Sequence, residues 1–355
     1  MADVTIAGGG VAGSMLASIL AGRGFRVKVY DIMRSYGKAC GDALTIREGF
    51  DRIVEETGSY KGEVHSFTVM VNGLEAASID FGHRVWFIID KPKLVNGLRE
   101  IAEANGAEII HSRWSRGKAP VTVDARGPYA WNVDDGNSVF VLRYIVESKW
   151  DPRHALLDFR TRERGFYWIF PADPDGRLVN IGAGFEEYRK LDRVRILVNK
   201  YAGNMLGKYK ILDERGAPIS IKVPVTLWSG DVFRVGEAAG LVISTAGEGN
   251  RPALESASAL ARALIDGWPD KGRVRRLYKK GVSRLVSSVK LSRTLLSIVE
   301  DSDPQWGAKI LSGLPKSFWA KYFTSTLMPK DLIPLALKRP GLGAIAVRSL
   351  LSSLF

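Results

Sequence analysis

The 355-residue sequence predicts an α/β (α+β) fold in which a βαβ domain is interrupted by an antiparallel sheet and followed by a helical C-terminal region. Three observations predict it. The chain opens with a short apolar strand at 4–7, a glycine turn and an alanine-rich helix at 11–22. Apolar residues alternate in the manner of strands over 64–89 and 138–185. Beyond a last strand at 232–235, nearly all of the chain has helical spacing, with prolines between the helices.

The order of the elements divides the chain into three parts. A second strand at 26–30, a helix at 93–105 and strands within 107–124 continue the opening domain, which is therefore discontinuous. A helix at 187–202 follows the strands of the inserted sheet. We predict the opening domain at 1–62, 90–136 and 228–268, the inserted substrate-binding sheet at 63–89 and 137–227, and the helical region at 269–355.

The positive charge of the sequence is concentrated at one end of the chain. The formal net charge is +13. Residues 271–355 hold sixteen basic and four acidic residues, whereas the 270 residues before them hold 35 and 34. A uniformly basic nucleic-acid-binding protein would not show this distribution, so the charge indicates one local surface and no nucleic-acid partner.

Cysteine and histidine use excludes several kinds of site. Cys40 is the only cysteine, which excludes an intramolecular disulfide and a multi-cysteine metal site and favours a reducing, cytoplasmic location. The four histidines lie in unrelated segments without metal-ligand spacing, so no metal is predicted. Residues 1–7 are typical of a buried strand and not of a signal peptide, and no apolar run is long enough to span a bilayer. The scarcity of cysteine and of glutamine, which occurs only at Gln305, is typical of thermophiles.

The first glycine turn has the spacing of a dinucleotide-binding motif. Gly8 permits a tight turn, Gly10 lets a pyrophosphate approach the backbone, and Gly13 lets the helix pack closely on the strand. The helix N-terminus then faces the phosphates with its dipole. Asp31 ends the second strand, 23 positions after Gly8, where it can bind a ribose hydroxyl pair.

A second motif favours FAD over NAD. The strand at 232–235 ends in Gly236-Glu237-Ala-Ala-Gly, which places a carboxylate where it can bind the ribityl chain of a flavin. Gly247, Gly249 and Asn250 then lead into another helix, whose N-terminus can stabilise negative charge on a reduced flavin ring. The sequence therefore predicts a Rossmann-like FAD-binding domain.

These motifs, together with the segments 38–43 (Lys-Ala-Cys-Gly-Asp-Ala) and 123–128 (Val-Asp-Ala-Arg-Gly-Pro), resemble the geranylgeranyl reductase family of flavoproteins, of archaeal type, which has the p-hydroxybenzoate hydroxylase fold. The resemblance covers about residues 3–265. It implies FAD and the reduction of isolated double bonds of an isoprenoid chain in lipid biosynthesis, with an isoprenoid lipid or prenyl diphosphate as substrate. The electron donor is open between NAD(P)H and a small acidic carrier such as ferredoxin.

The resemblance also implies which residues bind FAD. Lys91 stands at the position of a usual Arg, Glu237 at that of a usual Asp, and Asn250 at that of a usual Ile. Lys91 would supply a positive charge to the pyrophosphate through a single ammonium group, whereas arginine would bind it with two parallel N–H donors. The implied cofactor-binding residues are Gly8, Gly10, Ala12, Gly13, Asp31, Cys40, Gly41, Ala43, Lys91, Ser115, Asp124, Gly236, Glu237, Gly247, Gly249 and Asn250.

An aromatic segment is the predicted substrate-binding wall. Phe166, Trp168 and Phe170 alternate along a strand and therefore share one face. Such a wall suits a prenyl chain, which offers no hydrogen bonds, although the same side chains can simply fill a core. Cys40 lies in the segment of the family motif and is a candidate catalytic residue, or else a small buried apolar side chain.

Two other functions fit the same motifs. The same fold class hosts FAD-dependent aromatic monooxygenases, which consume NAD(P)H with oxygen in a smaller, more polar pocket. A lipid-binding module with a vestigial flavin site is the non-enzymatic alternative, and it would purify colourless.

The C-terminal helices carry an apolar stripe and crowded basic residues. The stripe comprises Val282, Leu285, Val286, Val289, Leu296 and Val299. A basic amphipathic helix favours peripheral contact with the inner face of the membrane, and the apolar segment 344–355 could dip into it. The alternative is a helical cap over the substrate pocket, with a solvated basic face.

Overall fold

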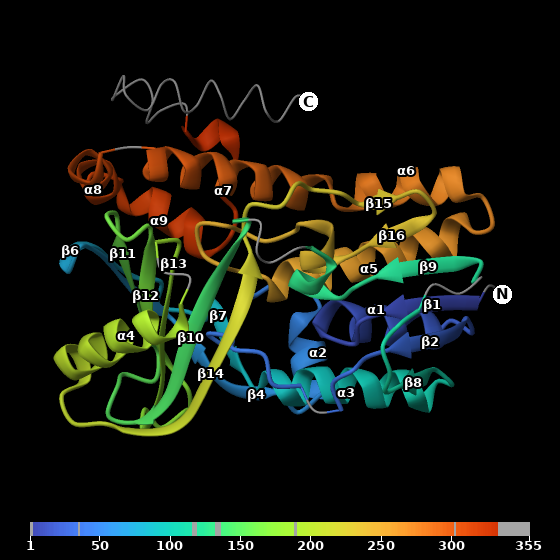
Figure 1. The fold of residues 1–355 in the computed structure, drawn as a ribbon, viewed down its shortest axis with the longest axis horizontal. Coiled ribbons are helices and arrows are strands. Elements are labelled where there is room, and N and C mark those ends of the chain that lie inside the picture. Colours follow the sequence, from blue (N-terminus) through green and yellow to red (C-terminus); the bar gives the residue numbers. More distant parts are fainter. Residues whose placement is uncertain are drawn as a thin grey trace.

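The computed structural model describes residues 3–34, 36–115, 119–131, 136–187, 190–301 and 303–332, without the side chains of 298–301. Three sheets and the helices around them make a mixed α/β fold, as predicted (Figure 1). Strands from distant parts of the sequence meet in each sheet. The division of the chain into domains stays a prediction.

A six-stranded sheet carries the glycine turn. Its order is β15-β16-β9-β1-β2-β8, parallel except for the pair β15–β16. The strands are β1 (Asp3–Ala7), β2 (Arg26–Tyr30), β8 (Glu108–Ile110), β9 (Val121–Asp124), β15 (Trp228–Ser229) and β16 (Val232–Arg234). The helices α1 (Val11–Ala21), α3 (Lys91–Ala104) and α5 (Asn250–Gly267) pack beside it, and both α3 and α5 contact α1. The carboxyl ends of β1, β2, β9 and β16 therefore meet at one edge, where ligands of parallel sheets bind.

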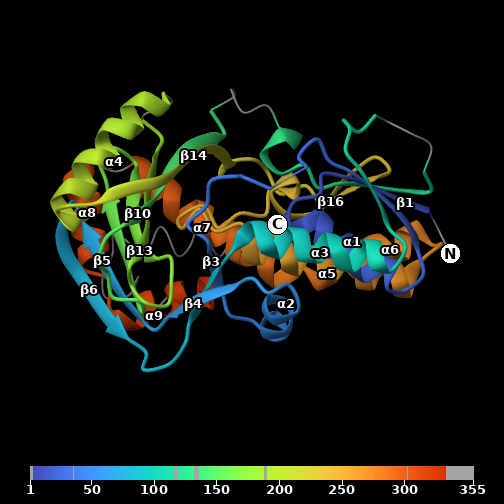
Figure 2. The same ribbon diagram turned by 90° about the horizontal axis from the view of Figure 1, so that it is seen from below.

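A seven-stranded sheet lies beside the first, in the order β14-β10-β13-β12-β11-β5-β6, antiparallel except for β5 and β11. Its strands are β5 (Ser66–Val71), β6 (Leu74–Asp80), β10 (Ser138–Glu147), β11 (His154–Arg160), β12 (Gly165–Pro171), β13 (Leu178–Phe185) and β14 (Lys210–Ser220). Figure 2 shows α4 (Leu191–Leu206) and α9 (Lys316–Phe323) on opposite sides of this sheet. One face is thus covered by α4, and the other faces the C-terminal helices.

A small third sheet connects the two large ones. It consists of β3 (Ala43–Thr45), β7 (Trp86–Ile89) and β4 (Tyr60–Val64), with the short helix α2 (Phe50–Glu56) between β3 and β4. Helix α2 was not predicted from the sequence, because its seven residues are too few to show a clear helical period. Gly49 precedes it with φ +81°.

Two predicted helices are displaced along the chain. The helix expected at 93–105 begins at Lys91, because Asp90 caps it: the Asp90 Oδ1 accepts the N–H of Lys93 at 3.1 Å. The helix expected at 187–202 spans Leu191–Leu206. Its buried positions Val194, Val198 and Ala202 follow the face that packs on the sheet.

The C-terminal helices extend over both large sheets. Figure 1 shows α6 (Lys271–Gly281) and α7 (Ser283–Asp301) along the top of the molecule, with α8 (Pro304–Ser312) and α9 turning down beside the seven-stranded sheet. The short 3₁₀ helix η3 (Pro329–Leu332) follows. In the described part of the chain, no helix is both long and apolar enough to cross a membrane.

The apolar stripe of α7 faces the protein. Val282, Leu285 and Val289 are each less than 5% exposed, and Leu296 lines a cavity described below. These four side chains are thus not available to a membrane, so the structure supports the helical cap for them. The side chain of Val299 and the segment 344–355 lie outside the described residues.

Candidate functional site

A large cavity lies where the six-stranded and seven-stranded sheets meet. Its volume is about 930 Å³, and its lining comes from the glycine turn, the 36–45 segment, the seven-stranded sheet and the C-terminal helices. Exposed lining residues include Ile32, Ser112 and Arg113 beside the six-stranded sheet and Arg164 beside the seven-stranded sheet. The cavity therefore joins a polar, glycine-rich part to an apolar, aromatic part.

The glycine turn follows β1 as the motif predicts. Gly8 has φ +99°, and a Cβ there would lie 2.5 Å from the carbonyl oxygen of Ala125. A Cβ at Gly13 would lie 1.9 Å from the carbonyl oxygen of Gly8, so Gly13 allows the close contact between helix and turn. Gly10 has open space beside it, with only the Tyr36 ring within 4 Å. The turn is thus closed toward the sheet and accessible from the cavity, which fits a pyrophosphate.

Asp31 lines the cavity beside this turn and is held by a residue that the sequence analysis missed. Its Oδ2 accepts the N–H of Gly9 at 2.9 Å and pairs with Arg99 Nη2 at 2.5 Å. Arg99, on α3, also donates from Nε to the Gly9 carbonyl oxygen at 3.0 Å and from Nη1 to that of Met33 at 3.2 Å. Arg99 is 5% exposed. One buried guanidinium therefore fixes both the predicted ribose-binding carboxylate and the predicted phosphate-binding turn.

The segment containing Cys40 crosses from the first sheet to the aromatic strand. Asn180 Nδ2 donates to the Cys40 carbonyl oxygen at 3.0 Å, and Asn250 Nδ2 lies 3.5 Å from the Cys40 Sγ. A Cβ at Gly41 would lie 2.7 Å from the Phe170 ring, so only glycine fits there. The thiol of Cys40 thus lies at the junction of the polar and apolar parts of the cavity.

Lys91 also lines this junction. Burial opposes its charge, but the Cys40 thiol, the Tyr36 hydroxyl and the Asp42 carboxylate hold the pKa of Lys91 above its usual value. Its Nζ lies 5.4 Å from the centre of the Tyr36 ring. Lys91 is therefore a fixed cation inside the cavity, as expected for a residue that faces a pyrophosphate.

Asp42 lies beside these residues in a left-handed conformation, with φ +57°. Burial raises its pKa, against the opposing charges of Arg143 and Lys91, and the Asn180 Nδ2 donates to its Oδ2 at 3.3 Å. A raised folded-state pKa means that stability is greatest below the unfolded value of 3.8 and is lost as pH rises through the folded-state pKa.

Replacing Asp42 by Asn should therefore stabilise the protein at pH 7, because asparagine needs no ionisation and tolerates φ > 0. We expect the melting temperature to rise by a few degrees, on the order of 1 kcal/mol for one such change. The gain should vanish below pH 3.8. Thermal unfolding between pH 3 and 8 checks this, with Asp175→Asn on an exposed turn as control; an equal gain in the control would contradict the explanation.

Glu237 faces the cavity with both carboxylate oxygens engaged. Lys38 Nζ lies 2.8 Å from its Oε2, and the backbone N–H of Ser220 donates to its Oε1 at 2.7 Å. A carboxylate accepts about four hydrogen bonds, so the group can still bind a hydroxyl. Glu237 therefore links the 36–42 segment, the end of β14 and the predicted ribityl position.

The loop 244–249 and the start of α5 close the cavity near Cys40. Asn250 is the first residue of α5, and its Nδ2 donates to the Ala43 carbonyl oxygen at 3.1 Å. The first N–H groups of a helix have no partner within it, and α5 is 18 residues long. The positive end of this helix thus points to the cavity, as expected for the charge of a reduced flavin.

The apolar part of the cavity is lined by the aromatic strand. Phe166, Trp168 and Phe170 lie on the face of β12 opposite α4, with Leu157 and Phe159 on the adjacent strand β11. Trp168 Nε1 donates to the Asn180 Oδ1 at 2.9 Å, so its one polar atom is satisfied. These aromatic residues line the cavity and also pack in a buried apolar cluster, and their role as a substrate-binding wall stays a prediction.

The opposite wall comes from the C-terminal helices, which sequence reasoning did not assign to individual residues. It comprises Leu295, Leu296, Ile310, Leu311, Leu314, Phe318, Trp319 and Tyr322. Trp319 and Phe318 are almost completely buried. The helical spacing of these residues was visible in the sequence, but not the surface against which they pack.

Most of the predicted cofactor-binding residues line this cavity, as do the three aromatic residues. The lining cofactor candidates are Gly8, Gly10, Ala12, Asp31, Cys40, Gly41, Ala43, Lys91, Glu237, Gly247, Gly249 and Asn250. Three others lie just behind it, and the fourth does not. Gly13 and Gly236 pack against Gly8 and Ala12, and Asp124 pairs with Arg126 at 2.8 Å. Ser115 is exposed, and its neighbour Trp114 lines the cavity instead.

Comparison with known proteins agrees with this geometry. No protein-family model matches the chain. A digeranylgeranylglycerophospholipid reductase from Sulfolobus acidocaldarius is 23% identical, over 75% of this chain and 69% of the relative. A geranylgeranyl bacteriochlorophyll reductase-like protein from Thermoplasma acidophilum has the same fold, with a TM-score of 0.79, 17% identity and coverage of 98% of this chain and 99% of that one. The chain resembles the geranylgeranyl reductases in both sequence and fold.

Other flavin enzymes share the fold less fully than the reductase-like protein does. A flavin-dependent brominase has a TM-score of 0.64 at 14% identity, over 88% of this chain and 93% of that one. A probable FAD-dependent monooxygenase from Pseudomonas aeruginosa has a TM-score of 0.63 at 19% identity, over 87% and 99%. The fold is thus one that flavin-dependent enzymes of several kinds share, and the match to the reductase-like protein covers more of this chain than the other two do.

Proposed function

We propose that this protein is an FAD-dependent oxidoreductase that reduces isolated double bonds of an isoprenoid chain, such as a geranylgeranyl group, in lipid biosynthesis. The observation that supports it most is the continuity of the cavity. A glycine turn, Asp31 and Lys91 line its polar part, and aromatic and aliphatic side chains line the rest. The apolar part of the cavity, here called the apolar chamber and lined by residues of β11, β12 and the C-terminal helices, suits a prenyl chain better than a small polar ring. The two reductase relatives support the same substrate class.

The residues present fit FAD. The open backbone at Gly10, the carboxylate of Asp31 and the cation of Lys91 suit its pyrophosphate and ribose, and Glu237, Gly249 and Asn250 suit its ribityl chain and ring. When bound, FAD supplies hydride transfer. The protein then has to hold the alkene near the ring and exclude water, because an unactivated double bond has no carbonyl to polarise. Cys40 is the candidate proton donor, since its thiol lies at the junction of both parts.

An aromatic monooxygenase remains the second candidate, because several enzymes of that kind share the fold. The two activities differ in their need for oxygen. The yellow protein should be photoreduced anaerobically and mixed with geranylgeraniol, a C20 prenyl alcohol. Reoxidation of the flavin together with a two-hydrogen mass gain of the alcohol supports the reductase; reoxidation by oxygen alone opposes it. A colourless protein that binds no added FAD would exclude both.

Filling the apolar chamber next to the loop 244–249 should strongly slow the turnover of geranylgeraniol. Ile219 lies on β14, 3.9 Å from the position of a Cβ on Gly247. We expect Ile219→Trp to lower kcat/KM for geranylgeraniol at least about tenfold, since overpacking displaces the chain from the reacting position. FAD content should stay unchanged. Ile211→Trp is the matched control, because Ile211 is exposed on the same strand; equal loss in both variants would contradict a chamber at Ile219.

The electron donor and the location of the protein are part of this proposal. One face of α6 and α7 carries a positive charge. It comes from exposed basic side chains, among them Arg276, Lys279, Lys280 and Arg284. That face suits either an acidic carrier such as ferredoxin or anionic headgroups at the inner face of the membrane. NAD(P)H is the alternative donor. We also propose the cytoplasmic location that the single cysteine predicts.

A further inference from the structure

The loop 244–248 separates the flavin-facing end of the cavity from the C-terminal helices. Thr245, Gly247 and Glu248 all line the cavity. The loop follows the Glu237 turn and leads directly into the N-terminus of α5. Any displacement of this loop therefore moves the groups that would face the ring of the cofactor.

Helix α7 holds this loop from one side. The backbone N–H of Thr245 donates to the Ser292 Oγ at 2.9 Å, and the two hydroxyl oxygens lie 3.1 Å apart. Ser292 is 4% exposed. Arg293, the next residue, donates from Nη2 to the Gly240 carbonyl oxygen at 2.5 Å. The main chain of the loop is thus bonded to one buried side chain of α7, and Arg293 holds the chain at Gly240, before the loop.

Helix α9 and Ser325, two residues beyond the end of that helix, hold the same loop. The Tyr322 hydroxyl donates to the Thr245 carbonyl oxygen at 3.0 Å, and the Ser325 hydroxyl donates to Glu248 Oε2 at 3.1 Å. The ring of Tyr322 lines the apolar chamber with those of Phe318 and Trp319. One side chain therefore contacts the predicted prenyl site with its ring and the loop 244–248 with its hydroxyl.

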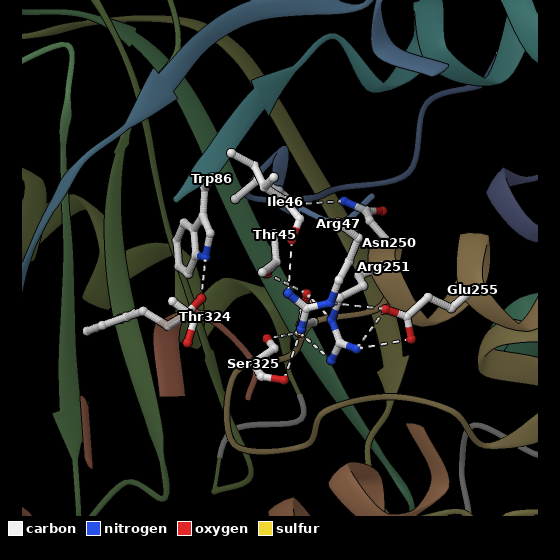
Figure 3. Close-up of polar contacts among 12 residues, drawn as sticks. Thr45, Ile46, Arg47, Trp86, Asn250, Arg251, Glu255, Thr324 and Ser325 are labelled. Carbon is white, nitrogen blue, oxygen red and sulfur yellow. Dashed lines mark hydrogen bonds and ion pairs between the residues drawn. The ribbon is translucent and has the colours of Figure 1, made fainter. Parts of the chain in front are cut away.

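The end of α9 is anchored independently of that loop. Figure 3 shows the guanidinium groups of Arg47 and Arg251 lying side by side between Ser325 and Glu255. Arg47 Nη2 donates to the Ser325 carbonyl oxygen at 2.9 Å, and Trp86 Nε1 donates to that of Phe323 at 2.8 Å. With these anchors, removal of one hydroxyl on α9 should leave the helix in place.

We propose that Tyr322 and Ser325 are positioning residues. Their hydroxyl groups hold the loop 244–248, here called the flavin loop, at a fixed position relative to the wall of the apolar chamber, so that the flavin ring lies next to the double bond of the prenyl chain. The inference rests on the proposed function. It assigns to α9 a second role besides apolar confinement. A mere packing role would need the rings of this helix but neither of the two hydroxyl groups.

The test removes the two hydroxyl groups and keeps the wall. Tyr322→Phe and Ser325→Ala, combined, should shift the midpoint potential of the bound flavin, measured anaerobically in the holoenzyme against a reference dye. With geranylgeraniol as probe, kcat should fall about tenfold while KM stays within about twofold. The variant loses the orientation of the flavin loop relative to the prenyl chain, but the prenyl chain stays buried in the apolar chamber.

The matched control is Lys321→Met on the same helix. Lys321 pairs with Asp331 at 2.6 Å and touches no residue of the loop by a hydrogen bond or ion pair in the described part of the chain. Unchanged potential and kcat in this control, with both altered in the double variant, support the proposal. Equal effects in the two proteins, or none in either, overturn it. The potential needs no prenyl substrate, so a shifted potential in the double variant together with a wild-type protein that reduces no prenyl chain would refute the proposed function and not the positioning role.

Discussion

Replacing Arg99 by methionine should weaken FAD binding and destabilise the fold together. The side chains of Arg99 and Asp31 are 6% and 10% exposed, so the variant leaves a nearly buried carboxylate without its counter-charge. Removing one partner of a buried pair typically costs about 3–5 kcal/mol. The Gly9 carbonyl oxygen also loses both donors that Arg99 supplies and keeps the Ser14 hydroxyl, so the turn loses much of what fixes it. We expect unfolding at a lower denaturant concentration and an FAD dissociation constant raised at least about tenfold.

Two further variants separate this explanation from general damage to α3. Arg26→Met breaks an exposed pair with Asp3, whose side chains are 80% and 46% exposed, and should cost less than about 1 kcal/mol. Adding Asp31→Asn to Arg99→Met removes the uncompensated charge, so part of the stability should return while FAD binding stays weak. If the double variant were no more stable than Arg99→Met alone, the buried charge would not be the cause.

Replacing Glu248 by glutamine should destabilise the protein in a pH-dependent way. Burial raises the pKa of this carboxyl, but Arg251 and the hydroxyls of Thr45 and Ser325 outweigh it and hold the pKa below its usual 4.5. Arg251 is almost fully buried, and its Nε and Nη2 donate to the Glu248 carboxylate at 3.1 and 3.2 Å. Glutamine leaves that guanidinium with Glu255 alone, at a cost of about 3–5 kcal/mol for a broken buried pair.

The sign of the pH dependence follows from the lowered pKa. A carboxyl with a depressed folded-state pKa contributes stability above its unfolded pKa, here 4.5, and loses it as pH falls through the folded value. The difference between wild type and Glu248→Gln should thus be constant from pH 5 to 8 and shrink below pH 4.5. Urea unfolding across this range measures it. Glu56→Gln, in an exposed pair with Arg52, is the control and should change stability by less than about 1 kcal/mol.

Local spacing in the sequence predicted the parts of the fold that depend on local chemistry. The glycine turn, with Gly8 at φ +99° and Gly13 against the Gly8 carbonyl oxygen, follows from residues within six positions of one another. The shared face of Phe166, Trp168 and Phe170 follows from the period of a strand. Both are encoded over a few residues, so no distant partner is needed to recognise them.

The interactions that complete the site depend on distant residues. Arg99 reaches Asp31 across 68 positions, and Tyr322 reaches Thr245 across 77. An arginine on a helix is ordinarily exposed, and nothing in the sequence beside Arg99 shows that its helix packs on the glycine turn. The start of the helix at Leu191 and not at 187 has a similar cause, because packing on the sheet decides it.

The order in which the chain is made has a consequence for the chamber wall. Residues 157–170 supply one side of the apolar chamber, and residues 310–322 supply the other. A chain emerging from the ribosome therefore presents Phe166, Trp168 and Phe159 to water until some 150 further residues have been added. During that interval the exposed aromatic strand can aggregate with other incomplete chains, and it becomes buried only when α9 packs against it.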